Sequence, residues 1–229
     1  MTKTKTRPEL LATGGAGVRH AVRGLYAVTA DTGDSAELQR RVGEAIAGGV
    51  RIVQYRNKTA PAVLRRQQAD MLVALCRRSE VPLIINDDIE LARAVGADGV
   101  HLGRTDAPLD AARAALGARA LVGVSCYDDL ARALEAERGG ASYVAFGSFY
   151  SSAVKPGAVL ASLDLLRRAR AALTVPIAAI GGITPDNAAQ LIAAGADALA
   201  VISALFNVPD SCTAAQAFAP AFASLPQSA

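Results

Sequence analysis

Residues 83–106 read LIINDDIELARAVGADGVHLGRTD and decide the fold, because two apolar runs flank a short helical pattern. The first run, residues 83–85, ends shortly before Asp87, and the second, residues 99–102, ends shortly before Asp106. Two strands that are joined through a helix run parallel and next to each other in one sheet. The stretch therefore predicts a strand–helix–strand unit in which an acidic side chain follows the carboxyl end of each strand.

The two aspartates suggest a metal site. Neighbouring strands lie about 4.8 Å apart, so Asp87 and Asp106 can reach one shared point beyond the strand ends. Two carboxylates at one point repel each other unless a cation or a proton lies between them, and carboxylate oxygens are ligands that Mg²⁺ prefers. A Mg²⁺ site is our first hypothesis. The alternative is that each aspartate caps the helix that follows it.

Strand-like and helix-like segments alternate along the chain from Gly24 onward. The predicted strand–helix pairs are 25–29 with 35–47, 51–55 with 61–78, 83–85 with 89–95, 99–102 with 109–116, 120–124 with 128–138, 143–146 with 162–173, 177–180 with 185–194, and 198–202 with 213–223. Eight such pairs with continuous apolar strands favour a single α/β domain, a closed (β/α)₈ barrel (TIM barrel), over an open doubly wound sheet. We expect the barrel to occupy residues 24–229 and residues 1–23 to form a basic, flexible and disordered extension.

Composition excludes several classes of protein. A hydrophobic fraction of 52% is too high for a disordered chain, and no apolar run approaches the roughly 20 residues of a membrane span. Five cationic side chains and one glutamate give residues 1–23 a charge of +4, so the total of +3 leaves the rest near −1. With only 4% aromatic residues, neither a nucleic acid nor a membrane is an expected partner. Three scattered cysteines without a C-x-x-C motif fit a reducing cytoplasm.

Cationic side chains at predicted strand ends indicate an anionic ligand. Gln54, Arg56 and Lys58 alternate at the end of the second strand, and period-2 geometry places them on one side. After residue 23 the chain contains 17 arginines but only two lysines, Lys58 and Lys155, and both follow strands. A compact ammonium group binds phosphate as a point charge. Two ordinary surface lysines are the alternative.

The later strand ends add hydroxyl groups and glycines. Ser125 follows the fifth strand and either donates to a phosphate or caps the next helix, whereas Cys126 lacks an activating neighbour and is expected to be a buried thiol. The long loop after the sixth strand, residues 148–157, is a candidate cover for a substrate. Gly182 and Ser203 follow the seventh and eighth strands, where barrel enzymes frequently bind a phosphate monoester.

These strand ends predict two anion sites, one around the paired carboxylates and the lysines, and one around the glycine and serine of the last two strands. A metal ion with several cations suits a departing pyrophosphate, whose negative charge grows as its C–O bond breaks. His101 is either a base near the carboxylates or, as we favour, a hydrogen-bonded residue of the strand end. The residues alone thus predict transfer of a group from a diphosphate ester to a phosphorylated partner.

A set of motifs at the strand ends extends this prediction. They are Gln54-x-Arg56-x-Lys58, Asn86-Asp87-Asp88, His101-Leu102-Gly103 with Asp106, Gly123-Val124-Ser125, Lys155, Ile180-Gly181-Gly182-Ile183 and Val201-Ile202-Ser203. In this order and at this spacing they resemble the thiamine-phosphate synthase family, and the likeness covers about residues 24–206.

The resemblance implies a reaction and a role for each of these residues. The family condenses 4-amino-2-methyl-5-(diphosphooxymethyl)pyrimidine with thiazole phosphate (carboxylate), giving thiamine phosphate and pyrophosphate through a dissociative carbocation route. By resemblance, the pyrimidine diphosphate would be bound by Gln54, Arg56, Lys58, Asn86, Ser125 and Lys155. The thiazole phosphate would be bound by Ser152, Ala153, Val154, Gly182, Ile202 and Ser203. Mg²⁺ would be held by Asp87 and Asp106, and the enzyme would be a cytoplasmic transferase, with a homo-oligomer compatible with the sequence.

The chain departs from the family pattern at two places. The loop before Lys155 usually reads Pro-Thr/Ser-x-Thr-Lys in the family, whereas this chain has Ser151-Ser152-Ala153-Val154-Lys155. Val154 removes a hydroxyl, and the lost hydrogen bond weakens acceptor binding by on the order of 1 kcal/mol. Arg104 stands where the family often has glutamine, which adds a charge beside Asp106. Two alternatives stay open, namely a thiazole tautomerase-like barrel that needs no metal and a non-catalytic sensor of thiamine precursors. The presence of both aspartates and both lysines argues against the tautomerase.

Overall fold

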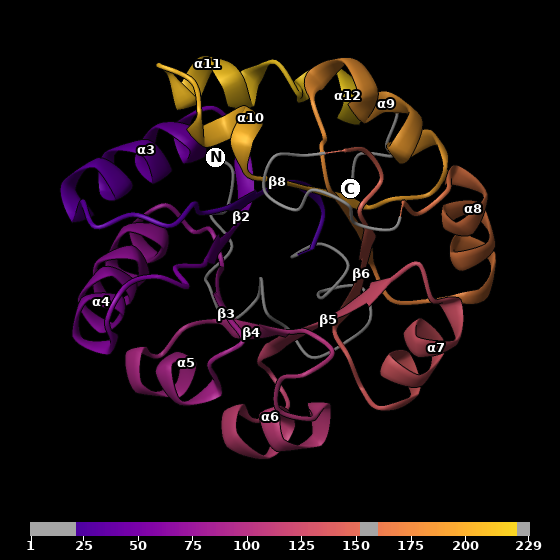
Figure 1. Cartoon of the computed structure of the whole chain (residues 1–229), viewed down its shortest axis with the longest axis horizontal. Coiled ribbons are helices and arrows are strands. Elements are labelled where there is room, and N and C mark those ends of the chain that lie inside the picture. The colour runs from indigo at the N-terminus through magenta and orange to yellow at the C-terminus, as the bar shows by residue number, and fades with distance from the viewer. Residues whose placement is uncertain (1–21, 152–159, 224–229) are drawn as a thin grey trace, which may run out of the picture.

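The computed structural model describes residues 22–151 and 160–223 and shows a closed parallel barrel surrounded by helices (Figure 1). Its strands follow one another around the barrel in chain order, and the last strand pairs with the first. The predicted (β/α)₈ architecture is therefore confirmed. Most of the predicted N-terminal extension, residues 1–21, lies outside the described residues, so its disorder stays a prediction.

The strands are β1 (Gly24–Val28), β2 (Val50–Tyr55), β3 (Leu83–Asn86), β4 (Gly99–Leu102), β5 (Leu121–Tyr127), β6 (Tyr143–Gly147), β7 (Ile177–Ile180) and β8 (Ala198–Val201). The helices of the ring are α3 (Ser35–Ala47), α4 (Ala62–Arg78), α5 (Ile89–Val95), α6 (Leu109–Leu116), α7 (Leu130–Arg138), α8 (Leu163–Ala172) and α9 (Pro185–Ala193). After β8 the chain forms three short helices, α10 (Ser203–Phe206), α11 (Ser211–Gln216) and α12 (Ala219–Phe222), which complete the ring between α9 and α3 (Figure 1).

Two segments differ from the prediction. β5 extends three residues farther than expected, so Ser125 and Cys126 lie within the strand, and the pairing with β6 shifts register between Ser125 and Tyr127. The predicted last helix, residues 213–223, is divided into α11 and α12. Pro220 lies in the first turn of α12. Proline lacks an N–H donor and cannot continue a helix from the preceding turn, which explains the division.

Side chains pack in two layers, one inside the barrel and one between the strands and the helices. Along β3, Ile84 belongs to the inner layer, whereas Leu83 and Ile85 belong to the outer layer, as alternation in a strand requires. Because both faces of every strand are covered, the strands read as continuous apolar runs. The inner layer consists of Tyr26, Val28, Ile52, Ile84, Leu121, Tyr143, Ala145, Ala178, Ala198 and Ala200, together with Val22 before β1.

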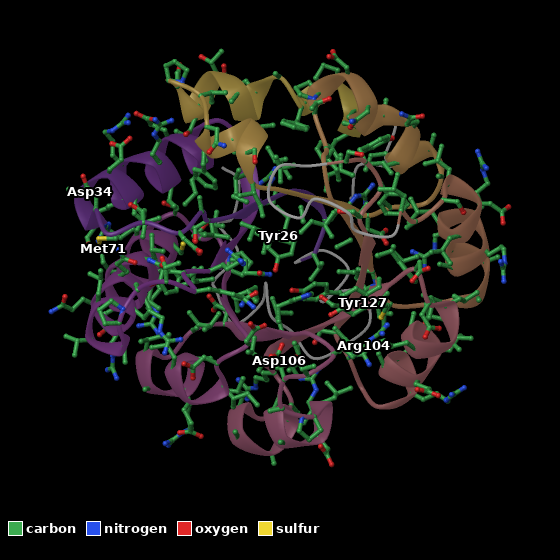
Figure 2. All side chains as sticks on the ribbon, viewed as in Figure 1. Tyr26, Asp34, Met71, Arg104, Asp106 and Tyr127 are labelled. Atoms are coloured by element: carbon green, nitrogen blue, oxygen red, sulfur yellow. The ribbon has the colours of Figure 1, made fainter. Side chains whose placement is uncertain are left out.

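Polar caps begin several of the outer helices. Asp34 lies at the outer edge of the molecule, where α3 begins, and its side chain accepts a hydrogen bond from the first turn of that helix (Figure 2). Asp129 and Ser162 do the same for α7 and α8. These caps belong to the connections that follow β1, β5 and β6, at the carboxyl end of the barrel, where barrel enzymes carry their active sites. Among the described helices, none is both long and apolar enough to cross a membrane.

Gly99 is required where β4 passes close to β5. A Cβ atom at this position would overlap the carbonyl oxygen of Leu121 and lie 2.9 Å from its Cα, and a side-chain rotation cannot relieve a contact with the backbone. We expect Gly99→Ala to lower the free energy of unfolding by about 1–3 kcal/mol, the usual cost of overpacking. Denaturant titration followed by circular dichroism measures the change.

Gly43 in α3 provides the matched control, because a Cβ atom there meets nothing within 4 Å. We expect Gly43→Ala to stabilise the protein by about 0.4–1 kcal/mol, since alanine restricts the unfolded chain and suits a helix. Equal stability of the two variants would contradict this prediction, because it would show that β4 and β5 can move apart to accept the methyl group without loss of stability.

Candidate active site

The carboxyl ends of the strands open into a cavity of about 950 Å³. It reaches down to Ala178 and Ala200 of the inner layer, and Tyr26 lies on its floor near the centre of the barrel (Figure 2). The predicted binding residues that line it are Gln54, Arg56, Asn86, Ser125, Gly182, Ile202 and Ser203. One concave site thus contains residues from both predicted anion sites.

Lys58 and Asp87 lie in a smaller pocket of about 360 Å³, and Asn86 lines both this pocket and the main cavity. The prediction that Lys58 lies on the same side as Gln54 and Arg56 was therefore wrong. β2 ends at Tyr55, and period-2 alternation holds only within a strand. The ammonium group of Lys58 instead reaches sideways to the end of β3.

Asp31 is a residue of this region that the sequence analysis missed. Its Oδ1 accepts hydrogen bonds from Nη1 of Arg56 at 2.9 Å and from the backbone N–H of Lys58 at 3.0 Å. Asp31 thereby holds the loop after β2 and partly neutralises Arg56. The available signal in the sequence is the position of Asp31 directly after the first strand, where a carboxylate can meet the cations of the second.

The two predicted metal ligands are held by the backbone of β3 and β4. Asp87 has a left-handed conformation with φ 64°, and its N–H donates to the carbonyl oxygen of His101 at 2.8 Å. Its Oδ2 lies 3.0 Å from Nζ of Lys58. Oδ2 of Asp106 accepts from the N–H of Gly103 at 2.6 Å, and the residue projects beside β4 (Figure 2). Short backbone contacts therefore position both carboxylates.

The pKa of Asp106 is raised by its surroundings, which include Asp87. Burial raises this pKa above its ordinary value, and a hydrogen bond with Asp87 and the charge of that carboxylate raise it further. The N–H of Gly103 and the ammonium of Lys58 act in the opposite direction without cancelling the shift. The convergence that adjacent strands predicted is present in the structure.

The residues present fit a Mg²⁺ ion. Two carboxyl groups that compete for one proton offer hard oxygen ligands at one point. Within residues 22–151 and 160–223, no three His, Cys, Asp or Glu side chains gather as a metal site. Asp87 and Asp106 would therefore supply part of the coordination, with the remaining positions available to water and substrate phosphate, as is usual for Mg²⁺.

The helix-cap alternative for these two aspartates is wrong. The side chain of Asp88 accepts from the N–H of Leu91 at 2.9 Å and caps α5. Pro108 precedes α6, and no side chain caps this helix. Asp87 and Asp106 are thus not used to begin the helices that follow them.

The first part of the loop after β6 is fixed across the end of β7. The N–H of Phe149 donates to the carbonyl oxygen of Ile180 at 3.1 Å, and the N–H of Tyr150 donates to that of Gly181 at 3.0 Å. A Cβ atom on Gly182, whose φ is 62°, would lie 2.6 Å from the carbonyl oxygen of Ser151. Gly182 therefore permits the close crossing. The predicted ligands Ser152, Ala153, Val154 and Lys155 lie outside the described residues, and their roles stay predictions.

Arg104 and its neighbours form one wall of the main cavity. The guanidinium carbon of Arg104 lies 4.7 Å from the ring centroid of Tyr127, in a cation–π contact (Figure 2). Arg132 donates to the carbonyl oxygens of Ser125 at 2.8 Å and Gly103 at 3.2 Å. Arg132 therefore ties the loop that carries Asp106 to the end of β5. Cys126 is buried behind this wall, and burial raises its pKa to about 12, as expected of an unreactive thiol.

A row of hydrogen bonds crosses the floor of the cavity. Nε2 of Gln54 donates to the hydroxyl of Tyr26 at 2.8 Å, and the hydroxyls of Tyr26 and Tyr143 are 2.7 Å apart. Nδ1 of His101 is 3.0 Å from the Tyr143 hydroxyl, and Nε2 is 2.8 Å from Oγ of Ser125. His101 is thus hydrogen-bonded through both ring nitrogens, as we favoured. The two tyrosines were missed, although strand alternation places their side chains inside the barrel.

A family model described as thiamine monophosphate synthase matches residues 25–205. The chain belongs to this family. The thiamine-phosphate synthase of Nitrosospira multiformis is 53% identical over 204 residues, which are 89% of this chain and 87% of that protein. The thiamine-phosphate synthase of Azoarcus sp. (strain BH72) is 56% identical over 202 residues, which are 88% of this chain and 98% of that protein.

A solved member of the family also has the same barrel. Thiamine phosphate pyrophosphorylase from Pyrococcus furiosus superimposes with a TM-score of 0.79 and is 32% identical, over 89% of this chain and 96% of that one. The family resemblance inferred from the strand-end motifs is therefore confirmed. Each motif that the structure describes contributes at least one residue to the main cavity or to the smaller pocket beside it, although Asp106 itself lines neither.

Asp87 and Asp88 are expected to differ in what they stabilise. Asp88→Ala removes the cap of α5 and should lower the free energy of unfolding by about 1 kcal/mol, or the melting temperature by about 2–4 °C. Asp87→Asn keeps a residue that tolerates the left-handed backbone and relieves repulsion with Asp106, so stability should be unchanged or slightly higher. Calorimetric melting of both variants beside the parent tests this; the reverse order would restore the helix-cap alternative.

Proposed function

We propose that the protein condenses 4-amino-2-methyl-5-(diphosphooxymethyl)pyrimidine with thiazole phosphate (carboxylate) to give thiamine phosphate and pyrophosphate. The observation that carries this proposal is the convergence of Asp87 and Asp106, with Lys58 beside them, next to a cavity large enough for two small substrates. Family membership supports the identity of the substrates.

The residues of β2, β3 and β5 would bind the pyrimidine diphosphate. Gln54 and Asn86 offer amide groups to the ring, while Arg56 and Lys58 offer positive charge to the phosphates. Ser125 would hold the diphosphate from the opposite wall, because it lines the same cavity. Asp31 pairs with Arg56 at 2.9 Å and limits the net positive charge of this wall, which would help pyrophosphate to leave again after reaction.

Asp87 and Asp106 would hold Mg²⁺, which when bound supplies positive charge that offsets the charge growing on the pyrophosphate. We propose a dissociative reaction, in which pyrophosphate leaves, a pyrimidinylmethyl cation forms and the thiazole nitrogen captures it. Where the acceptor carries a carboxylate, that group leaves as CO₂, so that the product is again thiamine phosphate. His101 lines the cavity but makes hydrogen bonds through both of its ring nitrogens. Cys126 is buried and does not line the cavity. A route that needs no protein nucleophile agrees with this arrangement.

The acceptor would lie against β7 and β8. Gly182 lines the cavity and would offer its backbone to the acceptor phosphate, and Ile202 and Ser203 line the same cavity at the start of α10. Ser152, Ala153 and Val154 would complete this side from the loop after β6. We also propose that the enzyme works in the cytoplasm.

The thiazole tautomerase alternative would require a general base near the acceptor. His101 is the nearest candidate that the sequence offered, yet its two ring nitrogens are engaged by Tyr143 and Ser125. The sensor alternative rests only on Val154, which lies outside the described residues. The synthase is therefore the function that we favour.

One incubation separates the three functions. Purified protein with both phosphorylated precursors and Mg²⁺ should form thiamine phosphate and pyrophosphate in equal amounts, and removal of Mg²⁺ by a chelator should stop both. Chromatography of the thiochrome derivative and an enzymatic pyrophosphate assay measure the two products. Isomerised thiazole without pyrophosphate would support the tautomerase, and tight binding of a precursor without product would support the sensor.

Asp87→Asn should remove the activity without harming the fold. Loss of one of two metal ligands should lower kcat/KM about 100-fold or more, because the charge of the leaving group is no longer balanced. Asp70→Asn is a matched control, since Asp70 lies in α4, away from both pockets, and pairs with the exposed Arg66. Steady-state kinetics with saturating Mg²⁺ tests the pair; wild-type rates for Asp87→Asn would remove the metal from the proposal.

The demand for Mg²⁺ should depend on pH. Asp106 must lose its proton before it binds a cation, and its pKa is raised, so the charged form is depleted at a higher pH than for an ordinary aspartate. The Mg²⁺ concentration for half-maximal activity should therefore rise as the pH falls from about 8 to about 5. Mg²⁺ titrations at several pH values measure this, and a requirement independent of pH would contradict the coupling between the two carboxyl groups.

A further inference from the structure

The hydrogen-bonded row under the cavity spans the barrel from β2 to β5. It consists of Gln54, Tyr26, Tyr143, His101 and Ser125, with successive polar atoms 2.8, 2.7, 3.0 and 2.8 Å apart. Its two ends, Gln54 and Ser125, both line the main cavity. Its middle is closed to solvent, because Tyr26 and Tyr143 are each only 1% exposed.

Both phenols keep their protons at neutral pH. Burial raises the pKa of Tyr26 to about 12, despite hydrogen bonds with Tyr143 and Gln54 that act in the opposite direction. Burial also raises the pKa of Tyr143 well above its ordinary value, and contact with Tyr26 adds to the shift. Each hydroxyl therefore has one proton that must find an acceptor, since a buried donor without a partner is costly.

The orientation of the Gln54 amide gives the row its direction. The amide nitrogen of Gln54 donates to the oxygen of Tyr26, so the hydroxyl of Tyr26 donates in turn to the oxygen of Tyr143. The proton of Tyr143 then has Nδ1 of His101 as its acceptor. A neutral imidazole that accepts at Nδ1 carries its own proton at Nε2, and Nε2 faces Oγ of Ser125.

Ser125 is consequently the end of the row at which a proton points into the cavity. Its oxygen accepts from His101, so its own O–H is left for a ligand. The reverse orientation of the Gln54 amide would reverse every bond, and Ser125 would then donate to His101 and turn lone pairs toward the cavity. Lone pairs repel a phosphate, whereas an O–H binds it.

We propose that His101, Tyr143 and Tyr26 are positioning residues that hold Ser125 as a hydrogen-bond donor to the diphosphate, with His101 fixed as the Nε2–H tautomer. This inference rests on the proposed function, since that function supplies the diphosphate. At the other end, Gln54 lines the cavity, and the same direction leaves its side-chain oxygen as an acceptor. The row thus presents a donor to the anionic end of the substrate and an acceptor to its amino-substituted ring.

The tautomer can be measured without any substrate. His20 and His101 are the two histidines of the chain, so His20→Gln leaves a single imidazole to observe. In the ¹⁵N-histidine-labelled variant, long-range ¹H–¹⁵N spectra should show a neutral ring with the proton on Nε2. A proton on Nδ1 would overturn the inference directly, even if the protein makes thiamine phosphate.

Two substitutions of His101 separate positioning from packing. His101→Gln places an amide near the Nε2 position and keeps a donor to Ser125, whereas His101→Asn places it near Nδ1 and leaves Ser125 without one. Binding of inorganic pyrophosphate with Mg²⁺, followed by calorimetry, should weaken about tenfold in His101→Asn and less than about threefold in His101→Gln. Equal losses in the two variants would overturn the inference, and melting curves confirm that both are folded.

A double variant tests whether His101 acts through Ser125. If it does, His101→Asn should weaken pyrophosphate binding in the parent but add nothing in a Ser125→Ala background. Additive losses would overturn the positioning role. Failure of the condensation assay would instead reject the proposed function, while the tautomer of the ligand-free protein would still decide the direction of the row.

Discussion

The interior of an eight-stranded barrel has little room, and the way in which this chain fills it determines the site. Tyr26 and Tyr143 occupy the centre together with bulky aliphatic side chains from β2, β3 and β5, whereas the fully buried residues that β7 and β8 contribute to the inner layer are alanines. The cavity extends down on the alanine side, to Ala178 and Ala200. Two phenols buried in this space must be hydrogen-bonded, and the partners within reach are Gln54 and His101. The floor of the active site is therefore a consequence of packing.

The two acidic side chains at the mouth depend on the same frame. Parallel pairing of β3 with β4 places Asn86 opposite His101, and the N–H of Asp87 continues the pairing by one more bond. Asp87 and Asp106 repel each other, yet backbone contacts with His101 and Gly103 hold them in place. The folding free energy of the barrel compensates for this electrostatic repulsion, and a divalent cation between the two carboxylates would relieve it.

Much of the fold and part of the site followed from local patterns. Strand and helix periods predicted the barrel, and adjacency of two strands predicted that Asp87 and Asp106 converge. Local patterns did not reveal which of two neighbouring aspartates caps α5, because that depends on the left-handed backbone of Asp87. They also failed at Lys58 and Asp31, which lie beyond the strand ends, where loop geometry replaces alternation. The tyrosine row was hidden because residues 117 positions apart meet only after the barrel closes.

The β6 loop begins by crossing over β7, and both main chain and side chains hold the part of it that the structure describes. The N–H groups of Phe149 and Tyr150 donate to the end of β7, while the ring of Phe149 is buried in the core and Tyr150 packs against it. The place at which this loop leaves the barrel is therefore fixed by contacts that also stabilise the core. Folding of the barrel and placement of the loop beside the cavity thus depend on the same residues.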